Sequence, residues 1–254
     1  MTSGLPRTSQ QARPLLSRRD LLLSSWFPFT FWRRRTVKIA GVPFRIVREG
    51  DDRRRYFWVH GNEQTAREVL LAHMKRVDGR AFLVNNDERY VTVAGGKLDP
   101  NRMFSREGAE KNLRALNPSW TSNKVHAVLD QLDCDRVKFL AAVLPRDGNL
   151  IIALHNNGPD YSVKDEEPIS DSVALNDPEH PSEFMLATNT QDFRVLSESP
   201  FNVVLQNESP DTDDGSLSRL AATRGIRYLN IEASHGNKAA QERMLRWVEE
   251  NLPV

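Results

Sequence analysis

The sequence predicts an α/β fold in which a mixed, mostly parallel central sheet is flanked by helices. Two observations predict it. Short apolar runs of strand length alternate with longer segments whose apolar residues recur at helical spacing, and several apolar runs end at polar residues. The 254 residues, 39% of them hydrophobic, can bury one good-sized core, so we expect one folded domain over residues 36–254.

Residues 1–35 are excluded from this domain. Polar, proline-containing sequence leads to the pair Arg18 and Arg19 and then to a short apolar run, an order that resembles a twin-arginine export signal. The basic residues 33–35 directly after that run oppose translocation, and a small-x-small cleavage site is not obvious. We expect export to the periplasm. The alternative is a disordered or interfacial leader on a cytoplasmic protein.

In the first part of the domain, the sequence predicts an edge hairpin, a buried strand and a crossover helix. Residues 37–47 alternate apolar and polar around a glycine-proline turn, the pattern of two short strands. The continuous apolar run 56–59 is typical of a central strand. Apolar residues recur at helical spacing over residues 63–77, which predicts the helix.

The remaining elements follow from the same criteria. We expect strands at residues 81–84, 90–93, 137–144, 149–154, 184–187, 193–196, 203–205 and 226–231. We expect helices at residues 106–116, 122–132, 216–223 and 237–252. Residues 156–182 contain many acids and show no periodic apolar pattern, so we expect a long loop of the kind that rims an active site.

Charge and cysteine content exclude several classes of protein. Lysines and arginines (35) nearly balance aspartates and glutamates (34), and the net charge of +1 provides no broad basic face for a nucleic acid. Cys134 is the single cysteine, which leaves His, Asp and Glu as the plausible metal ligands. No apolar run reaches the roughly eighteen residues that a transmembrane span needs.

His60 and Glu63 form the first motif with chemical potential. They lie three residues apart, where the apolar run 56–59 ends and a helix begins, so an imidazole nitrogen and a carboxylate can face one point. Two such ligands are two-thirds of a catalytic zinc site. In the alternative interpretation, His60 caps a strand and Glu63 lies in the first helical turn, where the helix dipole favours acids.

Three further motifs follow in order along the chain. They are Asp99-Pro100-Asn101-Arg102-Met103-Phe104, Leu154-His155-Asn156 and Tyr228-Leu229-Asn230-Ile231-Glu232. Together with His60 and Glu63, they resemble the zinc carboxypeptidase superfamily, especially its branch similar to succinylglutamate desuccinylase and aspartoacylase. The resemblance covers about residues 56–235, most of the chain.

The resemblance implies one zinc ion (Zn2+) held by His60, Glu63 and His155, with a fourth position for water. It implies that Glu232 is the general base, which takes a proton from water and returns it to the leaving amine. The alternative role of Glu232 is that of an acid at a helix N-terminus. The other histidines receive no metal role: His73, His126, His180 and His235.

The resemblance also implies that Asn101 and Arg102 bind a carboxylate of the substrate. A guanidinium can hold a carboxylate at two points, which lysine cannot do. The alternative for Arg102 is a surface salt bridge at a loop. The partner expected on this basis is a small molecule or peptide with a free carboxylate.

This sequence departs from the family pattern in two places near the predicted site. Ala153 stands two residues before the second histidine, where the family often has an aspartate that orients a ligand, so another acceptor is needed. Ala94 and Gly95 stand where the desuccinylase branch usually has an arginine that stabilises the oxyanion. Arg89 or Arg80 could substitute for it.

The leading functional interpretation is a zinc hydrolase that cuts an amide bond next to a free carboxylate, in an acyl-amino acid or a short peptide. No tyrosine lies between residues 161 and 228, where a digestive carboxypeptidase has its mobile tyrosine, which favours this branch. Two alternatives stay open. One is a carboxypeptidase that acts on peptides or cell-wall peptides, and the other is a catalytically inactive relative that binds a ligand or partner.

Overall fold

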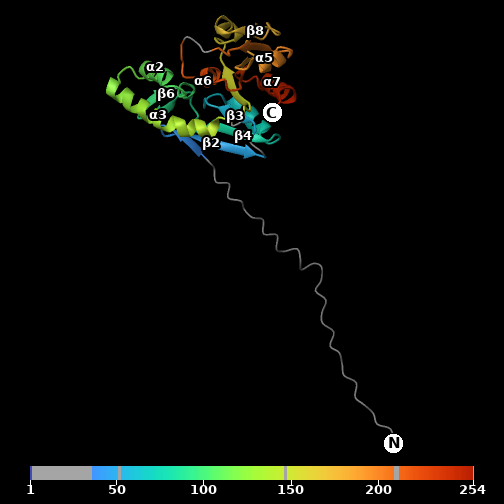
Figure 1. Cartoon of the computed structure of the whole chain (residues 1–254), viewed down its shortest axis with the longest axis horizontal. Coiled ribbons are helices and arrows are strands. Elements are labelled where there is room, and N and C mark those ends of the chain that lie inside the picture. Colours follow the sequence, from blue (N-terminus) through green and yellow to red (C-terminus); the bar gives the residue numbers. More distant parts are fainter. Residues whose placement is uncertain (2–35, 51–52, 146–147, 209–211, 254) are drawn as a thin grey trace. The chain divides into compact units, whose positions relative to one another are not determined.

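The computed structural model describes Met1 and residues 36–50, 53–145, 148–208 and 212–253. The predicted leader, with both arginines of its export-like motif, lies outside the described residues apart from Met1. The second of the chain's two units, Arg34–Val254, contains all the helices and strands reported below (Figure 1).

A mixed sheet runs through this unit. Its strands are β1 Thr36–Ile39, β2 Val42–Glu49, β3 Arg55–Trp58, β4 Gly79–Val84, β7 Ile151–Asn157, β8 Ser172–Ala174, β9 Phe184–Ala187, β10 Asn202–Leu205 and β11 Tyr228–Ser234. Within the described residues it has nine strands in the order β1-β2-β4-β3-β7-β11-β9-β10-β8. The central strands β4, β3, β7 and β11 are parallel, whereas β1, β2 and β8 pair antiparallel with their neighbours. The predicted mixed sheet with a parallel centre is confirmed.

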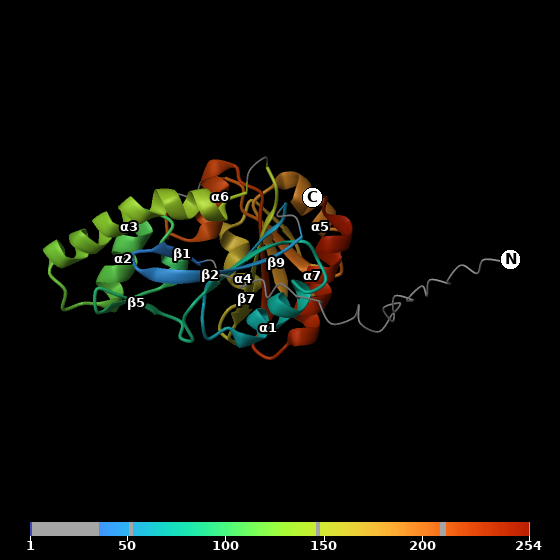
Figure 2. The ribbon, with the colours of Figure 1, turned by 90° about the horizontal axis from the view of Figure 1, so that it is seen from below.

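Helices cover both faces of the sheet. They are α1 Gln64–His73, α2 Arg106–Leu116, α3 Ser122–Val143, α4 Val163–Glu166, α5 Thr190–Leu196, α6 Leu217–Arg224 and α7 Lys238–Asn251, with 3-10 turns η1 Pro100–Arg102 and η2 Glu167–Ile169. Figure 2 shows α1 and α7 on one side of the sheet and α3 and α6 on the other. A separate two-stranded ribbon, β5 Val91–Val93 with β6 Gly96–Leu98, packs its second strand on α2. The apolar stripes of the helices are buried on the sheet, which stabilises the fold.

Two predicted strands are wrong because both segments are helical. Residues 137–144 continue α3 as far as Val143: Phe139 and Val143 are buried four residues apart, whereas Val137 is 73% exposed. Residues 193–196 belong to α5. The side chain of its N-cap residue, Asn189, accepts the first backbone N–H groups of the helix. A short apolar run does not by itself distinguish a strand from one face of a helix.

The predicted edge hairpin is confirmed as β1–β2, and the helix predicted at 106–116 coincides with α2. The segment predicted as one loop, 156–182, instead contains the end of β7 together with α4, η2 and β8. The observed β7 and β11 extend beyond the ends of the predicted strands, so His155 and Glu232 lie inside strands rather than after them.

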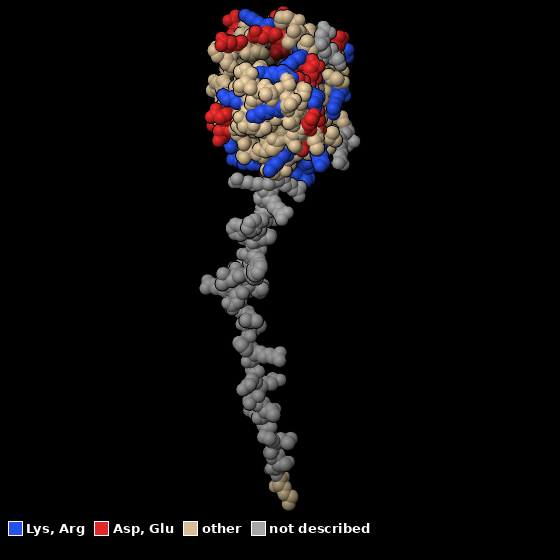
Figure 3. Space-filling view, turned by 90° about the vertical axis from the view of Figure 1, so that its left-hand side faces the viewer, with Lys and Arg blue, Asp and Glu red and all other residues tan. Residues whose placement is uncertain are grey.

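The surface agrees with the balanced composition. Figure 3 shows basic and acidic side chains interspersed over the face that it presents. Among the residues that the structure describes, no helix combines the length and the hydropathy that crossing a bilayer requires.

Candidate metal centre and active site

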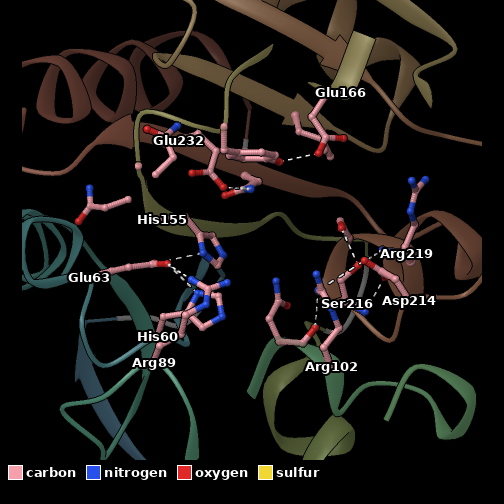
Figure 4. Close-up of a pocket in the computed structure, with 18 of the residues that line it drawn as sticks. His60, Glu63, Arg89, Arg102, His155, Glu166, Asp214, Ser216, Arg219 and Glu232 are labelled. Atoms are coloured by element: carbon pink, nitrogen blue, oxygen red, sulfur yellow. Dashed lines mark hydrogen bonds and ion pairs between the residues drawn. The ribbon is translucent and has the colours of Figure 1, made fainter. Parts of the chain in front are cut away.

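The carboxyl ends of β3 and β7 bring the three predicted metal ligands together. His60 follows β3, Glu63 is the N-cap of α1, and His155 lies in β7. All three are buried, and each offers one ligand atom within 4.8 Å of the others. Figure 4 shows the three side chains pointing toward one another. This cluster can hold one metal ion.

A tight turn between β3 and α1 positions the first two of these side chains. The backbone N–H of Glu63 donates to the carbonyl of His60 at 3.1 Å, and Trp58 Nε1 donates to the carbonyl of Glu63 at 2.9 Å. Glycine is required at position 61, because a Cβ there would lie 2.2 Å from the carbonyl oxygen of Asn86. Local packing therefore turns both side chains to the same side.

The third ligand is aligned by its neighbour in β7. Asn156 Oδ1 accepts the backbone N–H of Ala66 at 2.7 Å, which ties the first turn of α1 to this strand. Asn156 also donates to Gln241 in α7 at 3.2 Å. These buried bonds fix the separation between Glu63 and His155.

The buried polar atoms of the cluster fit a metal ion. Glu63 Oε1 lies 2.7 Å from His60 Nδ1, and Glu63 Oε2 lies 3.2 Å from His155 Nδ1. The contact with His155 does not have the geometry of a hydrogen bond, so within the described residues the buried Glu63 Oε2 has no hydrogen-bond partner. A buried carboxylate oxygen without a donor is costly, and a cation among these atoms would offset that cost. Two imidazoles and one carboxylate are the ligand types that zinc takes at catalytic sites.

Asp99 is a site residue that the sequence analysis did not select, although it opens the motif containing Asn101 and Arg102. Its Oδ1 lies 2.8 Å from His60 Nε2, so the other ring nitrogen, Nδ1, faces Glu63. Burial disfavours a charged imidazole, but the hydrogen bonds with Asp99 and Glu63 outweigh burial and raise the pKa of His60 to about 9. The additional acceptor expected from the departure at Ala153 is thus available, on His60 rather than on His155.

Arg89 joins the same cluster, as one of the two predicted substitutes for the missing arginine. Its Nη1 lies 3.4 Å from Glu63 Oε1 and its Nη2 lies 3.4 Å from Asp99 Oδ2. The side chain is 43% exposed and lines the cavity. Arg80, the other substitute, lies in β4 and is not among the described residues that line this cavity.

Glu232 faces the same cavity from β11. In the register of the parallel pair β7–β11 it is the partner of His155, and it is buried. Burial raises the pKa of Glu232; the charge of His155 opposes this effect and that of Glu63 adds to it. Asn230 Nδ2 donates to Glu232 Oε1 at 2.9 Å. A carboxylate with a raised pKa is suited to exchange a proton near neutral pH.

Asn101 and Arg102 both line the cavity from the turn η1. Arg102 Nη1 donates to the carbonyl of Asn101 at 3.0 Å and lies 3.4 Å from Asp214 Oδ2. Asn101 Oδ1 accepts the backbone N–H of Leu217 at 3.2 Å. Arg102 thus has the salt bridge of the alternative interpretation and also borders the predicted site.

The cavity that joins these groups has a volume of about 460 Å³, within the usual range for small-ligand sites. Its lining includes residues that the sequence analysis did not assign: Tyr161, Glu166, Gln206, Asp214, Arg219 and His235. The first two follow β7, and Gln206 directly follows β10. Asp214 precedes α6, Arg219 lies in α6, and His235 directly follows β11. No local signal singled them out, because each is an ordinary polar residue in its own segment.

No protein-family model and no curated protein sequence matches the chain. The chain is similar to the solved structure of the ectoine utilization protein EutE (DoeB) from Ruegeria pomeroyi, at 16% identity and a TM-score of 0.43, covering 81% of this chain and 59% of that one. It is similar to a succinylglutamate desuccinylase from Chromobacterium violaceum at 17% identity and a TM-score of 0.43, covering 87% and 75%.

A third similar structure is a succinylglutamate desuccinylase/aspartoacylase from Rhodobacter sphaeroides, at 17% identity and a TM-score of 0.44, covering 82% of this chain and 58% of that one. The chain spans about three-fifths of the length of EutE and of the Rhodobacter protein. These likenesses, at 16–17% identity, concern the fold; two of the three structures are a succinylglutamate desuccinylase and a succinylglutamate desuccinylase/aspartoacylase.

Proposed function

We propose that this protein is a zinc-dependent hydrolase that cuts an amide bond next to a free carboxylate, in an acyl-amino acid or a short peptide. One observation supports the proposal above all. The buried His60-Glu63-His155 cluster, the carboxylate of Glu232 and the guanidinium of Arg102 border a single cavity. A metal site, a base and a carboxylate anchor are the parts that this reaction needs.

The metal site would use Nδ1 of His60, Nδ1 of His155 and the carboxylate of Glu63. Zinc held by three protein ligands keeps one position for water and lowers the pKa of that water to about 7, which supplies a nucleophile at neutral pH. Asp99 fixes the His60 ring by accepting a hydrogen bond from Nε2.

Glu232 would take one proton from the attacking water and return it to the nitrogen of the leaving amine. The water oxygen becomes bonded to the acyl carbon, the carbon–nitrogen bond breaks, and the products are a carboxylic acid and an amine. Asn230 occupies Glu232 Oε1, so Oε2 is the oxygen that we assign to the proton. The buried position, which raises the pKa of Glu232, favours this transfer.

Asn101 and Arg102 would hold the carboxylate beside the scissile amide. Arg102 makes contacts to Asp214 and to one carbonyl, yet a guanidinium has five N–H donors and can add a carboxylate partner. Arg89, half-exposed and adjacent to Glu63, is the cation that we assign to stabilising negative charge on the amide oxygen during the reaction.

The test combines metal content with a hydrolysis screen on the full chain. Near-stoichiometric zinc by mass spectrometry, lost in His60→Ala, together with hydrolysis of N-acyl-amino acids, supports the proposal. Peptides in the same screen test the carboxypeptidase alternative. A carboxypeptidase would release the C-terminal residue of a peptide faster than it would hydrolyse an N-acyl-amino acid. A zinc-loaded protein that cleaves neither class contradicts the proposal and leaves the ligand-binding alternative.

A further inference from the structure

The cavity has a third charged end, which neither the metal cluster nor Arg102 occupies. It is formed by Glu166 at the end of α4 with Tyr161 and Gln206, and we call it the Glu166 end. Figure 4 shows Glu166 on the side of the view opposite Arg102 and Glu63. The proposed chemistry gives Glu166 no role.

The carboxylate of Glu166 is held by neutral donors. Tyr161 Oη donates to Oε1 at 2.5 Å, and Gln206 Nε2 donates to Oε2 at 2.5 Å. Within the part of the chain that the structure describes, the hydrogen bonds to its two oxygens both come from uncharged groups. Two carboxylate oxygens accept about four hydrogen bonds, so acceptor capacity remains. Neither of these two donors brings a positive charge to the carboxylate at the cavity wall.

The surrounding structure fixes this carboxylate in place. Gln206 is 2% exposed, and its backbone N–H donates to the carbonyl of Ala187 at 2.8 Å. Ser162 and Asp165 form a capping box at the start of α4. Burial and the charges of Glu232 and Glu166 raise the pKa of Tyr161, so its hydroxyl stays a donor. An acid held this rigidly is suited to recognising a ligand group.

We propose that the Glu166 end selects a cationic side chain, an ammonium or a guanidinium, on the amino acid that the hydrolase releases. This inference rests on the proposed function. In the proposed function, the scissile amide lies at the metal cluster and the adjoining carboxylate lies at Arg102. The side chain of the released amino acid can then extend to the Glu166 end of the cavity. A carboxylate attracts a cation there and repels a second carboxylate.

The inference separates two kinds of substrate. An N-acyl-lysine or N-acyl-arginine places its charge opposite Glu166, whereas an N-acyl-glutamate places like charges together. A neutral side chain of the same length provides no positively charged group to pair with the carboxylate of Glu166. We therefore expect a basic amino acid, and a poor reaction with a dicarboxylic one.

The experiment compares three substrates that differ only in the side chain: Nα-acetyl-L-lysine, Nα-acetyl-L-norleucine and Nα-acetyl-L-glutamate. For the zinc-loaded full chain, kcat/KM should be about tenfold to a hundredfold higher for the lysine than for the norleucine substrate, as expected for a charge-assisted contact. Glu166→Gln should remove that preference. Glu167→Gln, an exposed neighbouring acid outside the cavity, is the matched control and should keep it.

A binding measurement gives an independent readout. Calorimetric titration with free L-lysine and free L-norleucine, both potential products, should show tighter binding of lysine to the parent and to Glu167→Gln, but not to Glu166→Gln. Melting temperature and zinc content of the variants show whether the fold is intact. If Glu166→Gln does not fold, the parent's ratio of lysine to norleucine decides the question by itself.

The outcomes distinguish this inference from the proposed function. Equal hydrolysis of the lysine and norleucine substrates, or a lysine preference that survives in a folded Glu166→Gln, overturns the inference and leaves the hydrolase proposal standing. If none of the substrates is cleaved, the hydrolase proposal fails, and the titration alone decides. Tighter lysine binding that depends on Glu166 then supports the cationic subsite, and equal or no binding of the two amino acids rejects it.

Discussion

Asp99 Oδ1 lies 2.8 Å from Nε2 of His60, on the side of the ring away from Glu63. The same oxygen accepts the backbone N–H of Asn101 at 2.8 Å, at the start of the turn that carries Arg102. One buried carboxylate thus links the candidate metal cluster to the candidate carboxylate anchor. The positions of the two halves of the site are coupled through it.

This link predicts that Asp99→Ala weakens metal binding. Loss of the acceptor frees the His60 ring, and changes of this kind typically cost about tenfold to a hundredfold in metal affinity. Asp99→Asn keeps an acceptor oxygen and should lose less. Chelator competition with zinc measures both affinities, and a melting curve checks the fold. Unchanged affinity in a folded Asp99→Ala would show that the hydrogen bond does not orient the ligand.

Glu232→Gln should keep fold and zinc but lose most turnover, because it removes the proton acceptor and preserves shape. The expected fall in kcat is about a hundredfold to ten-thousandfold. The measurement is steady-state hydrolysis of an active acyl-amino acid, with zinc content determined on the same samples. Near-normal kcat in this variant would mean that another group is the base.

Arg102→Lys should weaken recognition of the carboxylate beside the scissile amide. Replacing the planar fork by an ammonium should raise KM, with a loss of about 1.5 to 3 kcal/mol in kcat/KM for acid substrates. Amidated analogues should react poorly with the parent and lose little more in the variant. Asp214→Asn, which removes the existing ion pair of Arg102, is the comparison and should not raise KM. Equal cleavage of acid and amide substrates by the parent would reject the anchoring role.

Glu249 in α7 predicts a dependence of stability on pH. Burial alone would raise its pKa, but the hydrogen bond from His73, the charge of Arg54 and the hydrogen bond from Tyr56 together lower it below the ordinary value of 4.5. Because the folded pKa is lower than the unfolded one, this stabilisation is present above about pH 4.5 and is lost as pH falls through the folded pKa.

Glu249→Gln should therefore lower the free energy of unfolding at pH 7 by about 1 to 3 kcal/mol. Below the ordinary glutamate pKa, the free energy of unfolding of the variant should fall less steeply with decreasing pH than that of the parent. Urea unfolding at neutral and acidic pH measures both effects. The exposed neighbour Glu250 is the matched control, and Glu250→Gln should resemble the parent. A variant at position 249 with the stability of the parent at pH 7 would contradict the prediction.

Export stays a prediction, since its motif lies outside the described residues. We propose that the leader directs a folded protein across a bacterial inner membrane through Arg18 and Arg19. Replacing both by lysine should leave the protein in the cytoplasm, as seen by cell fractionation. A reporter fused to residues 1–35 that is never exported, even with both arginines present, would reject the signal interpretation.

Sequence alone predicted the features that depend on neighbours in the chain. The helix at 106–116 follows from helical spacing over a few turns, and the observed α2 begins at a local cap, Ser105. His60 and Glu63 were recognisable as a pair because three residues and one turn separate them. The apolar run 56–59 likewise predicted a central strand, because a strand that is buried on both faces is recognisable from continuous apolar composition alone.

Tertiary structure decided what depends on residues far apart in sequence. Residues 137–144 are apolar enough for a strand, but α3 packs alongside α2 and β1, where only one face of the segment is buried. Asp99 contacts His60, which lies 39 residues away in the sequence, and Glu166 contacts Gln206, which lies 40 residues away. Periodicity and capping carry no information on such distances, because they report the environment of one segment. The pairing of strands and the packing of helices determine which polar side chains share a cavity.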